Sequence, residues 1–381
     1  MEAMRTLQDH LDRRVGELQR LKKEGVKIIG YAPGGYMPED LVYAAGAVPV
    51  GLVRGGDHEA VAESAAYLPR FLDTFCRSQI GYKMLGEEPL YEMVDLFVVP
   101  VTDNNMRAVA ESWSFYTGVE VFRFGVPHDK EDDAYQYYLE GLRMLRDKLE
   151  RFTGNKIEDS RLKDSIRLSN RMWESLEKLS LLRKSARPPV SGAEFARLNH
   201  ASFYADKPAL VNILESLCAE LKGKEGPGAK SRVLVTGSTL AMGDYKIVDL
   251  TEGAGGAVVI EEFAEGMRHY WQRVNLEGAV LEALADRYFR RRVPPAWFRP
   301  SRERIDFVMK LAREYAVDGI IWYQLMYRDG YDIQSFYFEK IVEKETGLRV
   351  LKVQSDYDRS EIGPLRTRLE TFVETVKGGR K

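Results

Sequence analysis

Cysteine and histidine are scarce in this sequence, and their spacing excludes several kinds of site. The 381 residues include two cysteines, Cys76 and Cys218, which lie too far apart to form a disulfide framework. The five histidines are scattered, with no His-x-x-x-His pair and no mixed Cys/His spacing, so no zinc site is predicted. The Gly-x-Ser-x-Gly elbow of serine hydrolases is also absent.

The sequence also lacks an excess of one charge and lacks long apolar runs. Lys and Arg number 56 against 58 Asp and Glu, whereas a protein that binds nucleic acid through a basic face has a large basic excess. No apolar run approaches the roughly 20 residues that span a bilayer. The N-terminal residues lead into a charged segment rather than the apolar core of a signal peptide. We therefore expect a soluble, cytoplasmic protein that binds neither nucleic acid nor membranes.

The hydrophobic pattern alternates between the two secondary-structure periods. Apolar residues at spacings of three and four predict an N-terminal helix over residues 1–25. Pro38 and the acidic pair after it are typical of the first turn of a second helix, over 38–47. Short apolar runs between the helical stretches predict four strands: Val26–Tyr31, Val48–Val53, Leu96–Pro100 and Val119–Phe124. This alternation predicts right-handed βαβ units and a parallel sheet over 26–130.

The alternation stops and then resumes later in the chain. From Glu131 to about Leu221 long charged stretches predict only helices, and a glycine-rich segment, 222–231, predicts a linker. Four more strands are predicted after it: Arg232–Thr236, Ala257–Glu261, Gly319–Tyr323 and Leu348–Val353. The predicted fold is α/β, with two parallel-sheet domains of Rossmann or flavodoxin type, 26–130 and 231–381, joined by a helical insert and linker over 131–230.

Ligands of open α/β sheets bind beyond the carboxyl ends of the strands, so the loops that follow the strands are the first candidates for a site. Gly34 and Gly35 follow the first strand, and Thr102 and Asp103 follow the third. None of these loops matches a dinucleotide or P-loop fingerprint. The glycines therefore either bring backbone amides close to an anion or simply permit tight turns.

Two further segments leave alternatives open. The acidic run over 259–265 ends a strand, so that Glu261 or Glu262 is either a base facing the crevice or one of several solvated acids at the sheet edge. Aromatic residues crowd the segment 322–338, where they either shape an apolar acyl pocket or belong to the core. For Trp322 and Phe338 we favour the core.

Three stretches carry a resemblance to a known family: Gly30–Val50 (GYAPGGYMPEDLVYAAGAVPV), Asp95–Arg107 (DLFVVPVTDNNMR) and Asp318–Asp329 (DGIIWYQLMYRD). Two short motifs follow these stretches in the sequence, at 355–357 (SDY) and 366–368 (RTR). Together they resemble subunits of the 2-hydroxyacyl-CoA dehydratase and benzoyl-CoA reductase family, of which the D-component of 2-hydroxyglutaryl-CoA dehydratase is one type. The likeness runs from about residue 26 to the C-terminus.

The resemblance implies a [4Fe-4S] cofactor held by three cysteines, but at most one of them is present in this chain. One family cysteine lies just before an Arg-Ser pair, which survives here as Arg77-Ser78 after Cys76, although its usual position falls on Asp73. The other two belong to Cys-Asp pairs, which become Thr102-Asp103 and Arg328-Asp329. Because cubane clusters are held mainly by thiolates, Cys76 alone does not complete a set within one chain.

The resemblance also implies a function and partners. It indicates a subunit that acts on or binds an acyl-CoA thioester in an ATP-activated, low-potential electron-transfer system, either a dehydratase (a lyase) or an aromatic acyl-CoA reductase. The implied partners are acyl-CoA, a similar or identical subunit and an ATP-dependent activator. The candidate catalytic residues are Asp103, Arg328 and Asp329, and the candidate substrate-binding residues are Gly34, Gly35, Arg77, Ser78, Thr102 and Tyr327. We expect one crevice to bring together Asp73, Cys76, Thr102, Asp103, Arg328 and Asp329. In it, Arg328 pairs with Asp103 or Asp329. The alternative is a cluster-free binding or assembly paralogue that kept the fold and lost redox catalysis.

Overall fold

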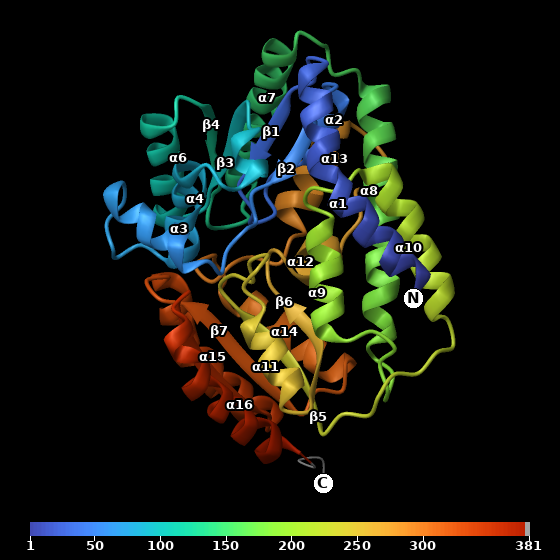
Figure 1. Cartoon of the computed structure of the whole chain (residues 1–381), viewed down its shortest axis with the longest axis vertical. Helices are drawn as coiled ribbons and strands as arrows, with labels where there is room; N and C mark the ends of the chain where they lie inside the picture. The colour runs from blue at the N-terminus through green and yellow to red at the C-terminus, as the bar shows by residue number, and fades with distance from the viewer. Residues whose placement is uncertain (378–381) are drawn as a thin grey trace.

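The computed structural model describes residues 1–377 and contains two four-stranded, all-parallel sheets (Figure 1). The first has the order β2-β1-β3-β4, and the second has the equivalent order β6-β5-β7-β8. All eight predicted strands are confirmed, and their bounds are Ile28–Tyr31 (β1), Val48–Gly51 (β2), Leu96–Val101 (β3), Glu120–Gly125 (β4), Ser231–Gly237 (β5), Gly256–Glu262 (β6), Gly319–Leu325 (β7) and Arg349–Ser355 (β8). The predicted fold class, two parallel α/β sheets, is therefore confirmed.

Helices separate the strands of the first sheet, as the right-handed crossovers of parallel strands require. Their bounds are Glu2–Lys23 (α1), Glu39–Ala44 (α2), His58–Glu63 (α3), Thr74–Leu85 (α4), Pro89–Glu92 (α5) and Asn104–Tyr116 (α6). The predicted helix over 38–47 is shorter than expected. Pro38 is its N-cap rather than its first helical residue, with φ −75° and ψ 103°.

Four helices follow β4 and contain no strand between them, as predicted for the segment from 131 to 221: Asp132–Thr153 (α7), Asp159–Leu182 (α8), Gly192–Ala201 (α9) and Lys207–Leu221 (α10). In Figure 1, α8 and α10 run along one side of the molecule beside α1. Asp40 of α2 ties α8 to the first sheet by accepting hydrogen bonds from Ser169 (2.6 Å) and Ser165 (3.2 Å). On the other side, α9 packs against β6 of the second sheet.

The second sheet carries a similar set of helices. Their bounds are Lys246–Gly253 (α11), Met267–Tyr270 (α12), Val280–Ala285 (α13), Arg302–Glu314 (α14), Asp329–Thr346 (α15) and Ile362–Val376 (α16), with a π-helical turn over Asp286–Arg290 after α13. None of the helices within residues 1–377 is long and apolar enough to cross a membrane.

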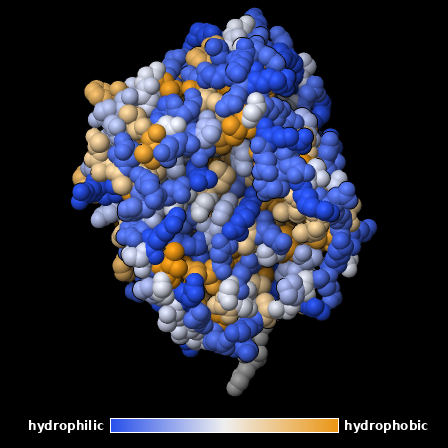
Figure 2. Space-filling model, viewed as in Figure 1, coloured by the Kyte–Doolittle hydropathy of each residue, from blue (hydrophilic) through white to orange (hydrophobic). Residues whose placement is uncertain are grey.

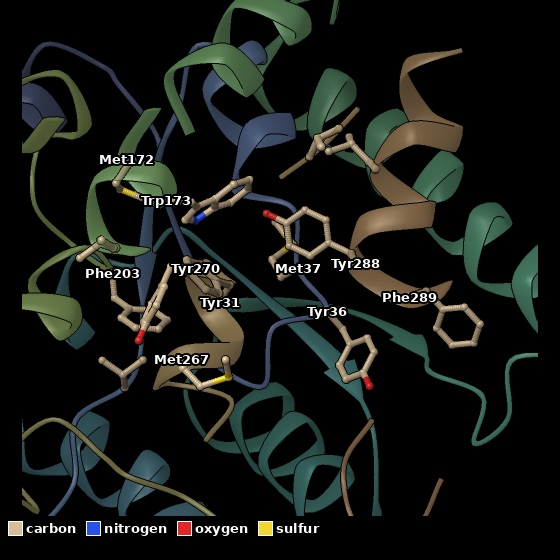
Figure 3. Close-up of a cluster of buried hydrophobic side chains, with 14 of the residues drawn as sticks. Tyr31, Tyr36, Met37, Met172, Trp173, Phe203, Met267, Tyr270, Tyr288 and Phe289 are labelled. Carbon is tan, nitrogen blue, oxygen red and sulfur yellow. The ribbon is translucent and has the colours of Figure 1, made fainter. Parts of the chain in front are cut away.

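The core lies around the central strands, which are buried on both faces. All seven residues of β7 and all four of β1 are buried, which is why these strands read as continuous apolar runs in the sequence. Figure 3 shows a part of the core to which α8, α12 and the π-helical turn contribute, where Trp173 and Tyr288 face each other with ring centroids 6.3 Å apart. On the face shown in Figure 2, hydrophobic residues form only small, separate patches in a hydrophilic surface.

The two sheets are joined directly as well as through the helices. The backbone amide of Gly55 donates to the carbonyl of Met242 (2.9 Å), and the amide of Met242 donates to that of Val53 (2.8 Å). These segments follow β2 and β5, so the carboxyl-terminal edges of both sheets face each other. The loops predicted to carry a site therefore lie in one region.

Candidate functional site

A narrow crevice lies where the carboxyl ends of the two sheets meet. It is lined by Pro33, Gly34, Tyr36, Phe75, Thr102, Met106, Ser238, Thr239, Ala264, Glu265, Arg268, Pro295, Trp297, Arg328 and Tyr331. The cavity volume is only about 30 Å³, which leaves room for about two water molecules. The lining combines an aromatic wall with buried charged groups, which is the usual composition of a small-molecule site.

Two aspartates of the crevice are fixed as helix N-caps. Asp73 accepts a hydrogen bond from the amide of Cys76 (2.9 Å) at the start of α4, and Asp103 accepts one from Met106 (3.0 Å) at the start of α6. A carboxylate at this position satisfies a backbone donor that has no partner within the helix, and it faces the positive end of the helix dipole. Each cap uses one oxygen and leaves the other free to bind across the crevice.

Arg328 crosses from the second half of the chain and binds both of these aspartates. Its Nη1 donates to Asp73 Oδ2 (2.5 Å) and to Cys76 Sγ (3.2 Å), and its Nη2 donates to Asp103 Oδ2 (3.0 Å). The side chains of Arg328, Asp73 and Asp103 are 9%, 0% and 12% exposed. Burial, with the nearby Asp73 charge, raises the pKa of the Cys76 thiol well above its ordinary value, so Cys76 is a thiol rather than a thiolate.

Thr102 takes part in the same arrangement. Its hydroxyl donates to Asp103 Oδ2 (3.0 Å), and its carbonyl oxygen lies 3.1 Å from Trp297 Nε1 and 2.6 Å from His128 Nε2. The predicted crevice residues Asp73, Cys76, Thr102, Asp103 and Arg328 are thus in mutual contact. Their functional roles stay predictions.

Gly34 lines the crevice, and both it and the next residue, Gly35, lie beside another arginine. Both have positive φ, 118° and 77°, which disfavours any residue with a side chain. Arg292 Nη2 donates to the Gly34 carbonyl (2.9 Å), and a Cβ at Gly35 would lie 1.9 Å from the same nitrogen. The glycines therefore permit close approach by a guanidinium. The alternative of backbone amides that cradle an anion has no contact to support it here.

Four other predicted site residues lie apart from this cluster. Arg77 binds the end of α3 and the turn after it, where Nη2 donates to the Val61 carbonyl (3.0 Å) and Nε to the Ser64 hydroxyl (3.2 Å). The Ser78 hydroxyl donates to the Phe75 carbonyl inside α4 (2.8 Å). Tyr327 is 49% exposed, and Asp329 is exposed at the start of α15. The hypothesis that Asp103 or Asp329 pairs with Arg328 thus holds for Asp103, and the second partner is Asp73 instead of Asp329.

The acidic run at the end of β6 contradicts both alternatives for Glu261 and Glu262, a base facing the crevice and a solvated acid at the sheet edge. Glu261 is buried in an ion pair with Arg183 (2.5 Å). Glu262 is buried between Arg268 Nε (2.9 Å) and Arg304 Nη2 (2.9 Å). Neither carboxylate lines the crevice; Glu265, three residues later, does.

Sequence reasoning missed Glu265, Arg268 and Arg292. Arg268 lies on α12, a helix of four residues, which is too short for a helical spacing of apolar residues to be recognised in the sequence. The carboxylate run over 259–265 was the available signal for Glu265, and the basic triplet 290–292 was the signal for Arg292. Charge runs do not reveal which member is buried, because that depends on how the chain folds back over the sheet.

The aromatic segment divides between the two alternatives. Trp322 and Phe338 are buried in the core and contact each other, with ring centroids 4.7 Å apart, as expected. Tyr331 lines the crevice and packs edge-on against Trp297, at 5.2 Å between ring centroids. Phe336 is exposed.

The donor set of the crevice does not fit a [4Fe-4S] cluster. Cubane clusters need three or four thiolates, and the crevice offers one cysteine, which is neutral and accepts a hydrogen bond from Arg328. The guanidinium of Arg328 occupies the space between Asp73, Cys76 and Asp103, where it repels a metal cation. No group of three or more His, Cys, Asp or Glu residues arranged to hold a metal occurs within residues 1–377. Cys218, expected to be buried, is only half-buried, and its Sγ faces the Ser175 carbonyl (3.5 Å).

The two equivalent parallel sheets, with a crevice between their carboxyl ends, define a two-sheet α/β protein. The profile of the family described as 2-hydroxyglutaryl-CoA dehydratase, D-component, matches residues 35–376. The chain belongs to this family.

Curated relatives cover nearly the whole chain. The putative dehydratase subunit YjiM of Escherichia coli (strain K12) is 29% identical over 93% of each chain. The (R)-phenyllactyl-CoA dehydratase beta subunit of Clostridium sporogenes is 23% identical over 94% of each chain. One of the benzoyl-CoA reductase subunits of Thauera aromatica is 23% identical over 92% of this chain and 91% of its own length. The family recognised from the sequence motifs is confirmed.

Proposed function

We propose that this chain is a cluster-free subunit of an acyl-CoA dehydratase or reductase, and that its crevice binds the acyl group of the thioester. The observation that carries the proposal is Arg328, which bridges Asp73 and Asp103 at the position where the family resemblance implies a thiolate. A charge-assisted pair of this kind positions side chains without redox chemistry. The relatives are named as acyl-CoA dehydratase and reductase subunits, which supports an acyl thioester as the ligand.

The crevice residues suit binding and orientation. Arg328 is held by two carboxylates, so its guanidinium is fixed before a ligand arrives, and fixed donors lose little entropy on binding. The rings of Tyr36, Trp297 and Tyr331 form an apolar wall that excludes water around an acyl chain. In this role Arg328 directs its remaining donor toward a carbonyl or carboxylate oxygen of the ligand.

The proposal includes partners and a location. A similar subunit, identical or different, supplies the cluster that this chain does not hold, and an ATP-dependent activator delivers the electron to it. This part of the proposal rests on family membership. The proposed location is the cytoplasm, where thiols are kept reduced, and both cysteines are free.

The second candidate is a binding or assembly protein of the same fold without an acyl-CoA site. The observation that favours it is the small volume of the crevice, about 30 Å³, because sites for drug-sized ligands measure about 300–1,000 Å³. The first candidate therefore requires the two halves of the crevice to separate when a ligand enters.

Calorimetric titration of the anaerobically purified chain with acyl-CoA thioesters tests the proposal, with and without a cluster-bearing subunit. We expect saturable thioester binding and less than stoichiometric iron and sulfide in the chain itself. The control variant is Arg171→Lys, which alters an arginine paired with Glu215 at the surface. A stoichiometric cluster lost on Cys76→Ala would overturn the cluster-free assignment, and binding to neither thioester nor subunit would leave only the fold.

A further inference from the structure

Three buried charged side chains that line the crevice each have a polar atom without a hydrogen-bond partner among the described residues. Within the part of the chain that the structure describes, Arg268 Nη2, Arg328 Nε and Glu265 Oε2 have no hydrogen-bond partner. The residues are 5%, 8% and 4% exposed, and all three line the same cavity. A buried polar atom without a partner is costly, and in native proteins such an atom is usually satisfied by water or a ligand.

On the Arg268 side of the crevice, guanidinium groups outnumber the carboxylates that pair with them. Glu262 forms ion pairs with two guanidinium groups, those of Arg268 and Arg304. Arg292 donates to the backbone carbonyl of Arg268 (3.1 Å) and is buried, yet it forms no ion pair with any carboxylate among residues 1–377. Burial, with Arg268 nearby, lowers the pKa of Arg292 to about 10. Arg292 therefore lacks a carboxylate partner among the described residues. Arg268 shares one with Arg304, whereas Arg328 has two.

The size and shape of the cavity select among anions. Space for about two water molecules matches the two oxygens of a carboxylate better than the bulkier tetrahedral phosphate. Carboxylates form charge-assisted hydrogen bonds with guanidinium groups, which are about twice as strong as bonds between neutral groups. Beyond the charged atoms, Phe75, Trp297 and Tyr331 offer apolar contact to the body of an organic acid.

We propose that the crevice is a carboxylate-binding site, in which Arg268 Nη2 and Arg328 Nε donate to the carboxylate of an organic acid and Glu265 faces it. The same carboxylate has two sources, a free acid or the far end of an acyl chain carried by coenzyme A. The inference rests on the proposed function only in the second case.

Binding of a carboxylate beside Glu265 is coupled to the uptake of a proton. Burial already raises the pKa of Glu265, and the backbone amides of Glu265 and Leu240, with Arg268 and Arg328, act in the opposite direction. His200 lies at the backbone carbonyl of Glu265, and the Tyr331 phenol lies at Arg268. Asp73, Asp103 and Glu262 already pair with Arg328 and Arg268. A second carboxylate disfavours the ionised form of Glu265, so Glu265 gains a proton from solvent and donates it to the ligand.

Calorimetry with three five-carbon probes tests the proposal: glutaryl-CoA, pentanoyl-CoA, which lacks the free carboxylate, and free pentanoate. Titrations in buffers of different ionisation enthalpy report the protons taken up. We expect glutaryl-CoA to bind about 10- to 100-fold more tightly than pentanoyl-CoA, because it adds a charge-assisted pair. We expect uptake of up to one proton with glutaryl-CoA, and none in Glu265→Gln.

Arg268→Lys keeps the positive charge beside Glu262 but removes the Nη2 donor. This variant should therefore lose the tighter binding of glutaryl-CoA relative to pentanoyl-CoA. Arg290→Lys is the matched control, because Arg290 pairs with Asp132 at the surface, and this variant should keep the tighter binding of glutaryl-CoA. Pentanoate binding that depends on Arg268, with no preference for glutaryl-CoA, assigns the site to free acids. Should Arg268→Lys fail to fold, Glu265→Gln still decides through proton uptake.

Equal affinity for glutaryl-CoA and pentanoyl-CoA, with no pentanoate binding, refutes the carboxylate site and leaves the proposed function standing. Unchanged proton uptake in Glu265→Gln refutes the role of Glu265. Pentanoate binding without binding of either thioester supports the carboxylate site and overturns the proposed function.

Discussion

Replacement of Arg328 by methionine should destabilise the protein strongly, because the substitution leaves two carboxylates without their cation. Asp73 is fully buried and keeps only its bond to the α4 amide, whereas Asp103 is 12% exposed and gains water. Removal of one partner of a buried ion pair costs about 3–5 kcal/mol. Because Asp103 is partly hydrated, we expect a loss of about 3 kcal/mol, at the lower end of that range.

Urea unfolding measures this loss, followed by circular dichroism and by tryptophan fluorescence to check that the two transitions coincide. Arg302→Met is the matched control, since Arg302 also pairs with two carboxylates, Asp306 and Glu345, but at the surface. It should change stability far less, because exposed pairs are screened by water. The double variant Arg328→Met/Asp73→Asn should recover about 1–3 kcal/mol of the loss. A loss no larger than that of Arg302→Met, or strict additivity of the pair, would refute the buried bridge.

Three further predictions follow from local geometry. Gly35→Ala should unfold at lower urea concentration than Gly118→Ala, because both glycines have positive φ but only Gly35 faces a guanidinium within 1.9 Å of the added carbon. A thiol reagent should label Cys218 in the native protein and spare Cys76, whose pKa burial raises, until the chain unfolds. Burial lowers the pKa of His200 to about 3, so below the unfolded value of about 6.5 only the unfolded chain binds the proton. The free energy of unfolding should therefore fall by about 1.4 kcal/mol for each unit by which the pH is lowered from about 6.5 to about 3. His200→Gln should remove this contribution, which urea midpoints measured across the pH range would show.

The strands were predictable because parallel strands are buried on both faces and appear as short apolar runs between helices. Their ends also located the crevice, since Thr102 and Asp103 follow β3 directly. Asp73 is not at a strand end. It entered the prediction only through the position of the family cysteine, and the structure shows that α4 begins there and points its first turn at the crevice.

Pairing within the crevice was not predictable in the same way. Asp103 and Asp329 each follow a strand, β3 and β7. Yet Asp103 caps α6 with one oxygen and turns the other to Arg328, while Asp329 is exposed on the first turn of α15. Glu262 is buried because two arginines from distant segments, on α12 and α14, meet it. Neighbours so far apart in sequence leave no periodic trace.

The contacts across the crevice decide how a ligand enters. Arg328 joins the loop before α15 to the starts of α4 and α6, Arg292 joins the π-helical region to the Gly34 carbonyl, and Asn105 donates to the Tyr327 carbonyl (3.3 Å). Backbone pairing of Met242 with Val53 and Gly55 also links the halves. An incoming carboxylate reaches the same guanidinium through Nε, which Asp73 and Asp103 leave without a partner among residues 1–377. Opening of the crevice therefore costs the Arg328 pairs and the hydrogen bond from Trp297 to the Thr102 carbonyl, and a carboxylate bound to Arg328 Nε offsets part of that cost.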